Sequence, residues 1–325
     1  MKNLLEQHEY IRELIALDNA VSDRKEFHEK VKPLLLKMGA DKTFLKEVIK
    51  RNFEDDGYLA QEWSGYNIPF FYVYENEHFN LKIHLFPPDK LKRDNIAAHC
   101  IHHHNNYMLT TNAFFGSGYE SMLFGKRPEV DPVSLKTDLT ISRHFHQKDW
   151  NPSTVDSWEP HVVFIPESLS ATILIWTPER KRHTDQFRQS KLLKTFKTPL
   201  RWMIHKLGLT QQFGIAEELT YQFYPDPSGK GFKGIEENTY FAPTKAEKGP
   251  ETDNYSAQMI FAFIQRCGIL DKEYFRSIKN KVPAYYHPWI DKVLSDTPIE
   301  DVYHRTEINI PQKTYYREDI LKAGV

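Results

Sequence analysis

The sequence predicts an α+β protein, in which an antiparallel β-barrel is flanked by N-terminal and C-terminal helices. Apolar residues recur at helical spacing before residue 60, and the same spacing returns after Pro178. Between these segments, short runs of aromatic and β-branched residues alternate with turn residues. We therefore expect an N-terminal helical segment at residues 1–60, a barrel at 61–180, and a mainly helical segment at 181–325 that packs on the barrel.

The composition of the 325-residue chain excludes several classes of protein. Its formal net charge is −1, so it lacks the excess of basic residues typical of nucleic-acid binding. Its two cysteines provide neither a disulfide framework nor a CxxC motif. Acidic residues interrupt the apolar N-terminal stretch, unlike in a signal peptide, and no apolar run reaches membrane-spanning length. We expect a cytoplasmic protein with no nucleic-acid or membrane partner.

The N-terminal segment has the pattern of amphipathic helices. From Leu4 to Phe53, apolar residues recur three or four positions apart. This spacing predicts about three helices, each with one face turned toward a core.

The central segment predicts consecutive short strands. Its aromatic and β-branched runs are broken by Pro, Gly, Asn and Asp, which favour turns. Many short strands without intervening helices indicate a sandwich or a barrel. The predicted strands are Ile68–Tyr74, Phe79–Phe86, Ile96–His104, Tyr107–Phe115, Tyr119–Phe124, Leu135–Phe145, His161–Ile165 and Ser170–Trp176.

Helices are predicted again in the C-terminal segment. Thr184–Leu207 and Tyr255–Cys267 show helical spacing, and Gly268 is positioned to cap the second of them. The stretches 225–234 and 242–254 are rich in Pro, Gly and charged residues, and we expect them to be surface loops.

Histidines cluster in the predicted barrel. Seven of the fifteen histidines lie between His99 and His161, in about a fifth of the chain. Along a strand, alternation sends His102 and His104 to one face and His103 toward the other. An H-x-H pair offers two imidazole nitrogens to one first-row metal ion, and a further ligand must come from elsewhere.

His161 is our first candidate for the third ligand. It begins a predicted strand pair, residues 161–178, whose central turn returns the chain beside the barrel. A second H-x-H pair, His144 and His146, could replace or join it. The competing interpretation is a solvated row of histidines that binds no metal. Four isolated histidines are expected to be structural: His84, His183, His205 and His287.

Two motifs in this region resemble those of the cupin superfamily, in particular its three-histidine thiol dioxygenase branch, to which cysteine dioxygenase belongs. The first, HHHNNYMLTTNAFFGSGYE at residues 102–120, contains an H-x-H, a hydrophobic strand, a glycine-containing turn and a glutamate. The second, HVVFIPESLSATILIWTP at 161–178, places a histidine before a hydrophobic pair, a turn and a strand ending in Trp-Thr-Pro. The resemblance covers about a third of the chain. It implies a cupin barrel, or double-stranded β-helix, with Fe(II) bound by His102, His104 and His161.

The sequence departs from this branch at several positions. Residues 107–109 stand where many cupins have a carboxylate ligand, so three histidines alone are implied. Thr172, Leu174 and Trp176 occupy the places of the Ser-His-Tyr relay of cysteine dioxygenases. Leu109 lies near the place of their crosslinked cysteine, and a carboxylate-binding arginine ahead of the motif is not evident. Free cysteine is therefore not the expected substrate.

Together these features predict a mononuclear non-heme iron(II) oxygenase that acts with O₂ on a small chelating substrate. Arg143 is a candidate for binding an anionic group, Tyr107 and Trp176 for an apolar wall, and His146 for a further substrate contact. One alternative is a zinc or manganese cupin that uses the same ligands for isomerisation or hydrolysis. Another is a non-catalytic ligand-binding or interaction protein whose helical arms form a homodimer.

Overall fold

The computed structural model describes residues 5–59, 68–89, 101–104, 107–125, 128–131, 133–178, 221–226, 231–236, 250–303 and 316–324. The predicted helix Thr184–Leu207 lies outside these ranges, as do His99, Cys100, His183 and His205. Among the helices that fall inside them, none is long and apolar enough to cross a membrane.

Residues 5–59 form the helices α1 (Glu9–Ala20), α2 (Arg24–Ala40), α3 (Lys42–Phe53) and the single turn α4 (Asp56–Leu59). Aspartates cap two of them, because a carboxylate satisfies backbone N–H groups that have no partner inside the helix. Asp23 accepts a hydrogen bond from the backbone N of Glu26 at 2.8 Å. Asp41 accepts from the backbone N of Thr43 at 2.8 Å. The prediction of about three N-terminal helices is confirmed, with α4 in addition.

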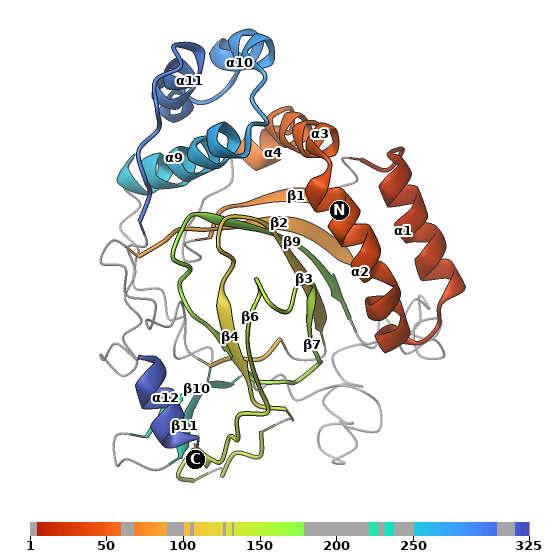
Figure 1. Cartoon of the computed structure of the whole chain (residues 1–325), viewed down its shortest axis with the longest axis vertical. Helices are drawn as coiled ribbons and strands as arrows, with labels where there is room; N and C mark the ends of the chain where they lie inside the picture. The colour runs from red at the N-terminus through yellow and green to blue at the C-terminus, as the bar shows by residue number, and fades with distance from the viewer. Residues whose placement is uncertain are drawn as a thin grey trace, which may run out of the picture.

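The strands within the described ranges form three antiparallel sheets (Figure 1). The largest has the order β1-β2-β9-β3-β7. A second sheet has the order β6-β4-β8, and a third has the order β10-β11-β5. None of these sheets closes into a barrel within the described residues, so the double-stranded β-helix remains a prediction. The strands are β1 (Phe70–Glu75), β2 (Asn80–Phe86), β3 (Met108–Phe115), β4 (Glu120–Leu123), β5 (Lys136–Thr137), β6 (Arg143–His146), β7 (Ser153–Val155), β8 (His161–Val163), β9 (Ser170–Thr177), β10 (Tyr221–Pro225) and β11 (Phe232–Glu236).

Several strand predictions need correction. The predicted strand Leu135–Phe145 is split into β5 and β6, which belong to different sheets. The predicted loop 225–234 contains the start of β11, which is held by pairing with β5 and β10. The strand pair predicted at 161–178 is not a hairpin, because β8 pairs with β4 whereas β9 pairs with β2 and β3. The turn between β8 and β9 therefore carries the chain from one sheet to another.

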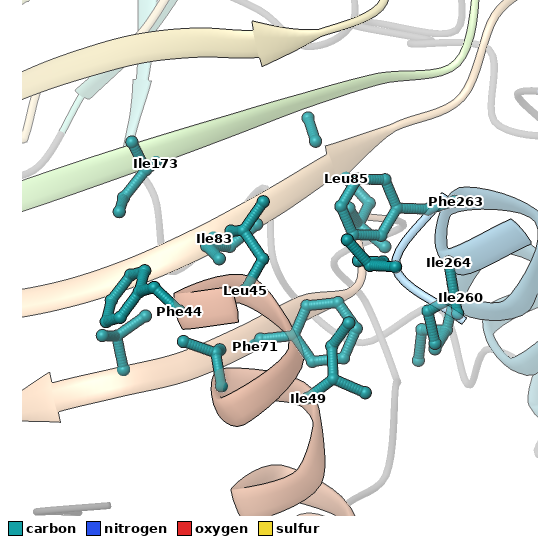
Figure 2. Packing of buried hydrophobic residues seen from close by; sticks show 14 of the residues in the cluster. Phe44, Leu45, Ile49, Phe71, Ile83, Leu85, Ile173, Ile260, Phe263 and Ile264 are labelled. Carbon is teal, nitrogen blue, oxygen red and sulfur yellow. The ribbon is translucent and has the colours of Figure 1, made fainter. Parts of the chain in front are cut away.

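Helices cover one face of the five-stranded sheet. Alternation along β2 turns Ile83 and Leu85 toward α3 and α9 (Pro250–Cys267), and Ile173 of β9 points the same way (Figure 2). Phe44 of α3 and Phe263 of α9 are buried in the same core. Because this face is filled by helices, the opposite face of the sheet is available for a cavity.

The C-terminal end of α9 has a glycine cap. Gly268 has a φ of +68°, a conformation that glycine adopts without steric cost. The backbone N of Ile269 donates to the carbonyl of Ile264 at 3.2 Å, which is the bond of a Schellman motif. The predicted cap is confirmed, although α9 begins at Pro250, five residues before the predicted start at Tyr255. The 3₁₀ turns Lys279–Lys281 and Ala284–Tyr286 and the helices α10 (Lys272–Ile278) and α11 (His287–Leu294) follow α9.

A second hydrophobic core lies on the outer face of the three-stranded sheet β6-β4-β8. Met122 of β4 and Val162 of β8 pack in it with Phe223 of β10, Phe232 of β11 and Ile320 of α12 (Arg317–Ala323). The inner face of this sheet instead packs toward the five-stranded sheet, in a separate small cluster. The two sheets therefore form a sandwich with both outer faces covered.

Candidate metal site

Three histidines from two chain segments meet at one end of the sandwich. The segment 101–104 bridges to β8, because the backbone N of His102 donates to the carbonyl of His161 at 3.0 Å, and the carbonyl of His102 accepts from the backbone N of His161 at 2.8 Å. His104 follows two residues later, on the same side. One ring nitrogen of each of His102, His104 and His161 lies within 4.8 Å of the others. Three nitrogen donors at this separation form a group that could hold one metal ion.

His161 is held in one tautomer by the backbone. Its Nδ1 lies 3.1 Å from the carbonyl oxygen of Glu159, and a carbonyl only accepts, so Nδ1 carries the proton. Its Nε2 then keeps a lone pair for a metal ion. Burial holds the pKa of His161 well below its usual value, and the neighbouring His102 lowers it further. The ring is therefore neutral, which is the form that binds metals.

An ion pair supports the residue that orients His161. Nη2 of Arg143 lies 2.7 Å from Oε2 of Glu159, which is buried and also accepts from the backbone N of Asp156 at 2.9 Å. Arg143 and His161 both pair with Leu123, from opposite sides of β4. The sequence suggested Arg143 for substrate binding, but the structure places it in this ion pair, and it does not line the cavity described below.

Within the segment 101–104, His103 lies on the face opposite to the candidate ligands His102 and His104. His103 is buried on the other side, with its ring centroid 5.4 Å from that of Trp158 and 6.3 Å from that of Phe223. This agrees with the alternation read from the sequence. Trp158 has a φ of +61°, which is uncommon for a bulky residue. His103 and Trp158 thus tie the 101–104 segment to the loop before β8.

His144 and His146 lie away from the three-histidine cluster. Both alternate with Phe145, whose side chain lines the cavity between the sheets. His144 contacts the carboxylate of Glu120 through Nε2. His146 accepts a hydrogen bond from the backbone N of Lys148 at 3.1 Å. The structure therefore does not bring this second H-x-H pair to the site.

The three histidines form part of the wall of a cavity that lies between the two facing sheets. Trp176 is part of its wall, with its ring centroid 4.3 Å from that of His104. Tyr107 lies outside the wall, 42% exposed, with its ring centroid 6.2 Å from that of Trp176. Of the four residues suggested for substrate binding, only Trp176 lines this cavity.

Sequence reasoning missed the polar part of the cavity wall. His84 was expected to be structural, but it lines the cavity, and burial lowers its pKa to about 3, with a smaller effect of Lys82. The available signal was its position on β2, where it alternates with the apolar residues Ile83 and Leu85 that face the helices. Five hydroxyl side chains also line the cavity: Thr111, Tyr119, Ser121, Ser153 and Thr172.

Some of these hydroxyl groups form a buried network. Oγ1 of Thr111 accepts from Tyr119 at 3.3 Å and from Nε2 of Gln147 at 2.9 Å. It also lies 3.1 Å from Oγ of Ser153. Thr172 differs, because its fully buried Oγ1 has no hydrogen-bond partner among the described residues. The hydroxyl groups around Thr111 are thus held in place by hydrogen bonds, whereas the hydroxyl group of Thr172 has none within the described residues.

Comparison with known proteins gives only weak likenesses. No family model matches the chain, and no curated protein matches it. An RmlC-like cupin with a double-stranded β-helix fold from Methanocaldococcus jannaschii is 10% identical over 38% of this chain and 92% of its own, with a TM-score of 0.22. A cupin-2 domain from Rhodospirillum rubrum is 10% identical over 42% of this chain and 84% of its own, with a TM-score of 0.21. The capsular polysaccharide assembling protein CapF from Staphylococcus aureus is 13% identical over 39% of this chain and 36% of its own, with a TM-score of 0.23. At these TM-scores the likeness supports no argument about function, which has to rest on the site itself.

Proposed function

We propose that this chain is a cupin-type, mononuclear non-heme iron(II) oxygenase that acts with O₂ on a small chelating substrate. The observation that carries the proposal is the convergence of His102, His104 and His161 in the wall of one cavity. The arrangement of two facing antiparallel sheets is compatible with a double-stranded β-helix, which forms part of the proposal.

The donor set fits a first-row divalent metal. Imidazole nitrogens suit iron, zinc, copper and nickel, whereas calcium and magnesium prefer oxygen ligands. No carboxylate lines the cavity within the described residues. The choice of iron comes from the two motifs at 102–120 and 161–178, which resemble those of three-histidine dioxygenases.

The chain's own residues would prepare such a site in three ways. The Glu159 carbonyl fixes the ring of His161 through Nδ1. Trp176 packs against His104 and limits the access of water to that ligand. Three neutral ligands leave the charge of a divalent ion uncompensated, so the site favours a chelating, electron-rich substrate group. When bound, Fe(II) would supply the coordination positions and the redox chemistry for O₂.

The proposal is tested by metal content and oxygen uptake. Protein purified without added metal is expected to contain one iron ion per chain, and His104→Ala is expected to lose both iron and O₂ consumption with chelating test compounds. His144→Ala is the matched control, because His144 belongs to the other H-x-H pair and lies outside the cluster. Iron retained in full by His104→Ala would contradict the proposal.

Zinc is the second candidate, because the same three imidazoles suit zinc as well as iron. A zinc or manganese ion would make the chain a hydrolase or isomerase. Protein that contains stoichiometric zinc or manganese and consumes no oxygen would favour this alternative.

A further inference from the structure

The cavity wall is polar but uncharged. The lining residues among those described include histidines, hydroxyl side chains and apolar groups, and no Asp, Glu, Lys or Arg. Burial keeps His84 neutral, as its pKa of about 3 indicates. A charged group that entered this part of the cavity would lose its hydration without gaining an opposite charge, which is costly. The wall therefore favours neutral ligand groups.

Thr172 offers an unused hydrogen-bonding group to this cavity. Thr172 is 0% exposed and lines the cavity, and its Oγ1 has no hydrogen-bond partner within the part of the chain that the structure describes. Buried hydroxyl groups without a partner are uncommon in folded proteins, because each costs free energy. Thr172 stands directly across from His84 in the β2–β9 pairing. The two side chains together present a donor and acceptor pair on one face of the sheet.

Thr172 and the three histidines lie toward opposite ends of the cavity. Trp176, which contacts His104, lies on the same face of β9 four residues away. Four residues of strand correspond to about 13 Å between Cα atoms. Leu174 lies between them and also lines the cavity. A ligand that reaches from the histidines toward Thr172 thus passes an apolar middle section. The cavity volume is only about 40 Å³, which favours a slender ligand.

We propose, on the basis of the function proposed above, that the substrate is a small slender molecule with two distinct ends. One end chelates the metal at the three histidines, and the other carries an uncharged hydroxyl or carbonyl group that binds to Thr172 and His84. The site discriminates against molecules with a carboxylate or ammonium group at this far end.

Three hydroxamates of equal chain length test the proposal, because a hydroxamate chelates first-row metals through two oxygens. Butanohydroxamate ends in a methyl group, γ-hydroxybutanohydroxamate in a hydroxyl group and succinohydroxamate in a carboxylate. Their binding to Co(II)-loaded protein is followed by the change in the cobalt absorption spectrum. The hydroxyl compound is expected to bind about five- to tenfold more tightly than the methyl compound, since one net hydrogen bond contributes about that factor. The carboxylate compound is expected to bind most weakly of the three.

Variants at Thr172 identify the group responsible. Thr172→Val removes the hydroxyl group with little change in shape, and it should abolish the advantage of the hydroxyl compound over butanohydroxamate. Thr172→Ser keeps a hydroxyl group and should retain the preference. Thr154→Val is the matched control, because Thr154 of β7 turns away from the cavity and contacts Thr110.

The outcomes separate this inference from the proposed function. If the protein takes up no Co(II) at a site that His104→Ala removes, the proposed function fails and this inference fails with it. If Co(II) binds there but the three hydroxamates bind equally, or the carboxylate compound binds best, only this inference is wrong. Failure of all three to bind the loaded protein would also overturn it, as would an unchanged preference in Thr172→Val.

Discussion

Replacing Arg143 with glutamine tests how the loop before β8 holds the third candidate ligand. Arg143 does not line the cavity, and its guanidinium pairs with Glu159 at 2.7 Å. Because the carbonyl of Glu159 accepts from Nδ1 of His161, loss of the ion pair should loosen the orientation of that ring. We therefore expect weaker metal binding without the loss of any ligand.

The size of the effect follows from the structure. Groups that orient metal-binding histidines typically change metal affinity by about 10- to 100-fold, or about 1.4–2.7 kcal/mol. The Glu159 side chain is 5% exposed, but that of Arg143 is 37% exposed, so solvent screens the pair in part. We expect a loss near the lower limit, about tenfold, for Arg143→Gln. Glu159→Gln should lose less, because an amide oxygen still accepts from the backbone N of Asp156.

Competition between the protein and a chromogenic chelator for Co(II) and Zn(II) measures this change. Arg317→Gln is the matched control. Nε of Arg317 lies 3.1 Å from Oε1 of Glu120, and neither residue lines the cavity, so this substitution should leave metal affinity unchanged. Equal metal affinity in Arg143→Gln and wild type would refute the role assigned to the ion pair. A similar loss in Arg317→Gln would mean that general destabilisation, rather than the orientation of His161, is the cause.

Three further predictions concern stability. Thr172→Val should be neutral or stabilising in urea unfolding, because it removes a hydroxyl group that has no partner among the described residues. Thr177→Val should instead cost about 1–3 kcal/mol, because it leaves Nε2 of buried His28 without its 2.7 Å contact. Equal effects of the two substitutions would contradict this explanation. Burial lowers the pKa of His28 to about 3, below the unfolded value near 6.5, so the unfolded state binds more protons between these two pH values. As the pH falls through this range, the free energy of unfolding should therefore decrease by up to about 1.4 kcal/mol per pH unit. His28→Gln should make the pH dependence of unfolding shallower, and an unchanged slope would show that His28 is not buried and neutral. Gly268→Ala should destabilise by about 1 kcal/mol, since alanine is strained at a φ of +68°, and a higher midpoint of thermal unfolding would contradict the assigned cap.

Local periodicity predicted much of the architecture. The N-terminal helices, the glycine cap of α9 and the position of β2 follow from residue spacing and turn chemistry alone. Alternation also separated His102 and His104 from His103, which packs on Trp158 instead. These features depend on neighbours within a few residues, so a single sequence contains the information.

Features that depend on distant partners were not predictable. Glu159 is 16 residues from Arg143, and nothing in either local sequence indicates their ion pair. His84 reaches the cavity only because β2 lies beside β9, an order that periodicity does not reveal. The pairing of β11 with β5 joins segments almost a hundred residues apart, which a loop-like composition concealed. Sheet order was therefore missing, and so was the existence of the short strands β7, β10 and β11.

The most direct test of the central claim is a crystal structure of the metal-loaded protein with anomalous diffraction data collected at the iron and zinc absorption edges. We expect one anomalous peak in bonding contact with Nε2 of His161 and with one ring nitrogen each of His102 and His104. A protein that crystallises with these rings as described but shows no peak between them, or a peak beside His144 and Glu120 instead, would contradict it.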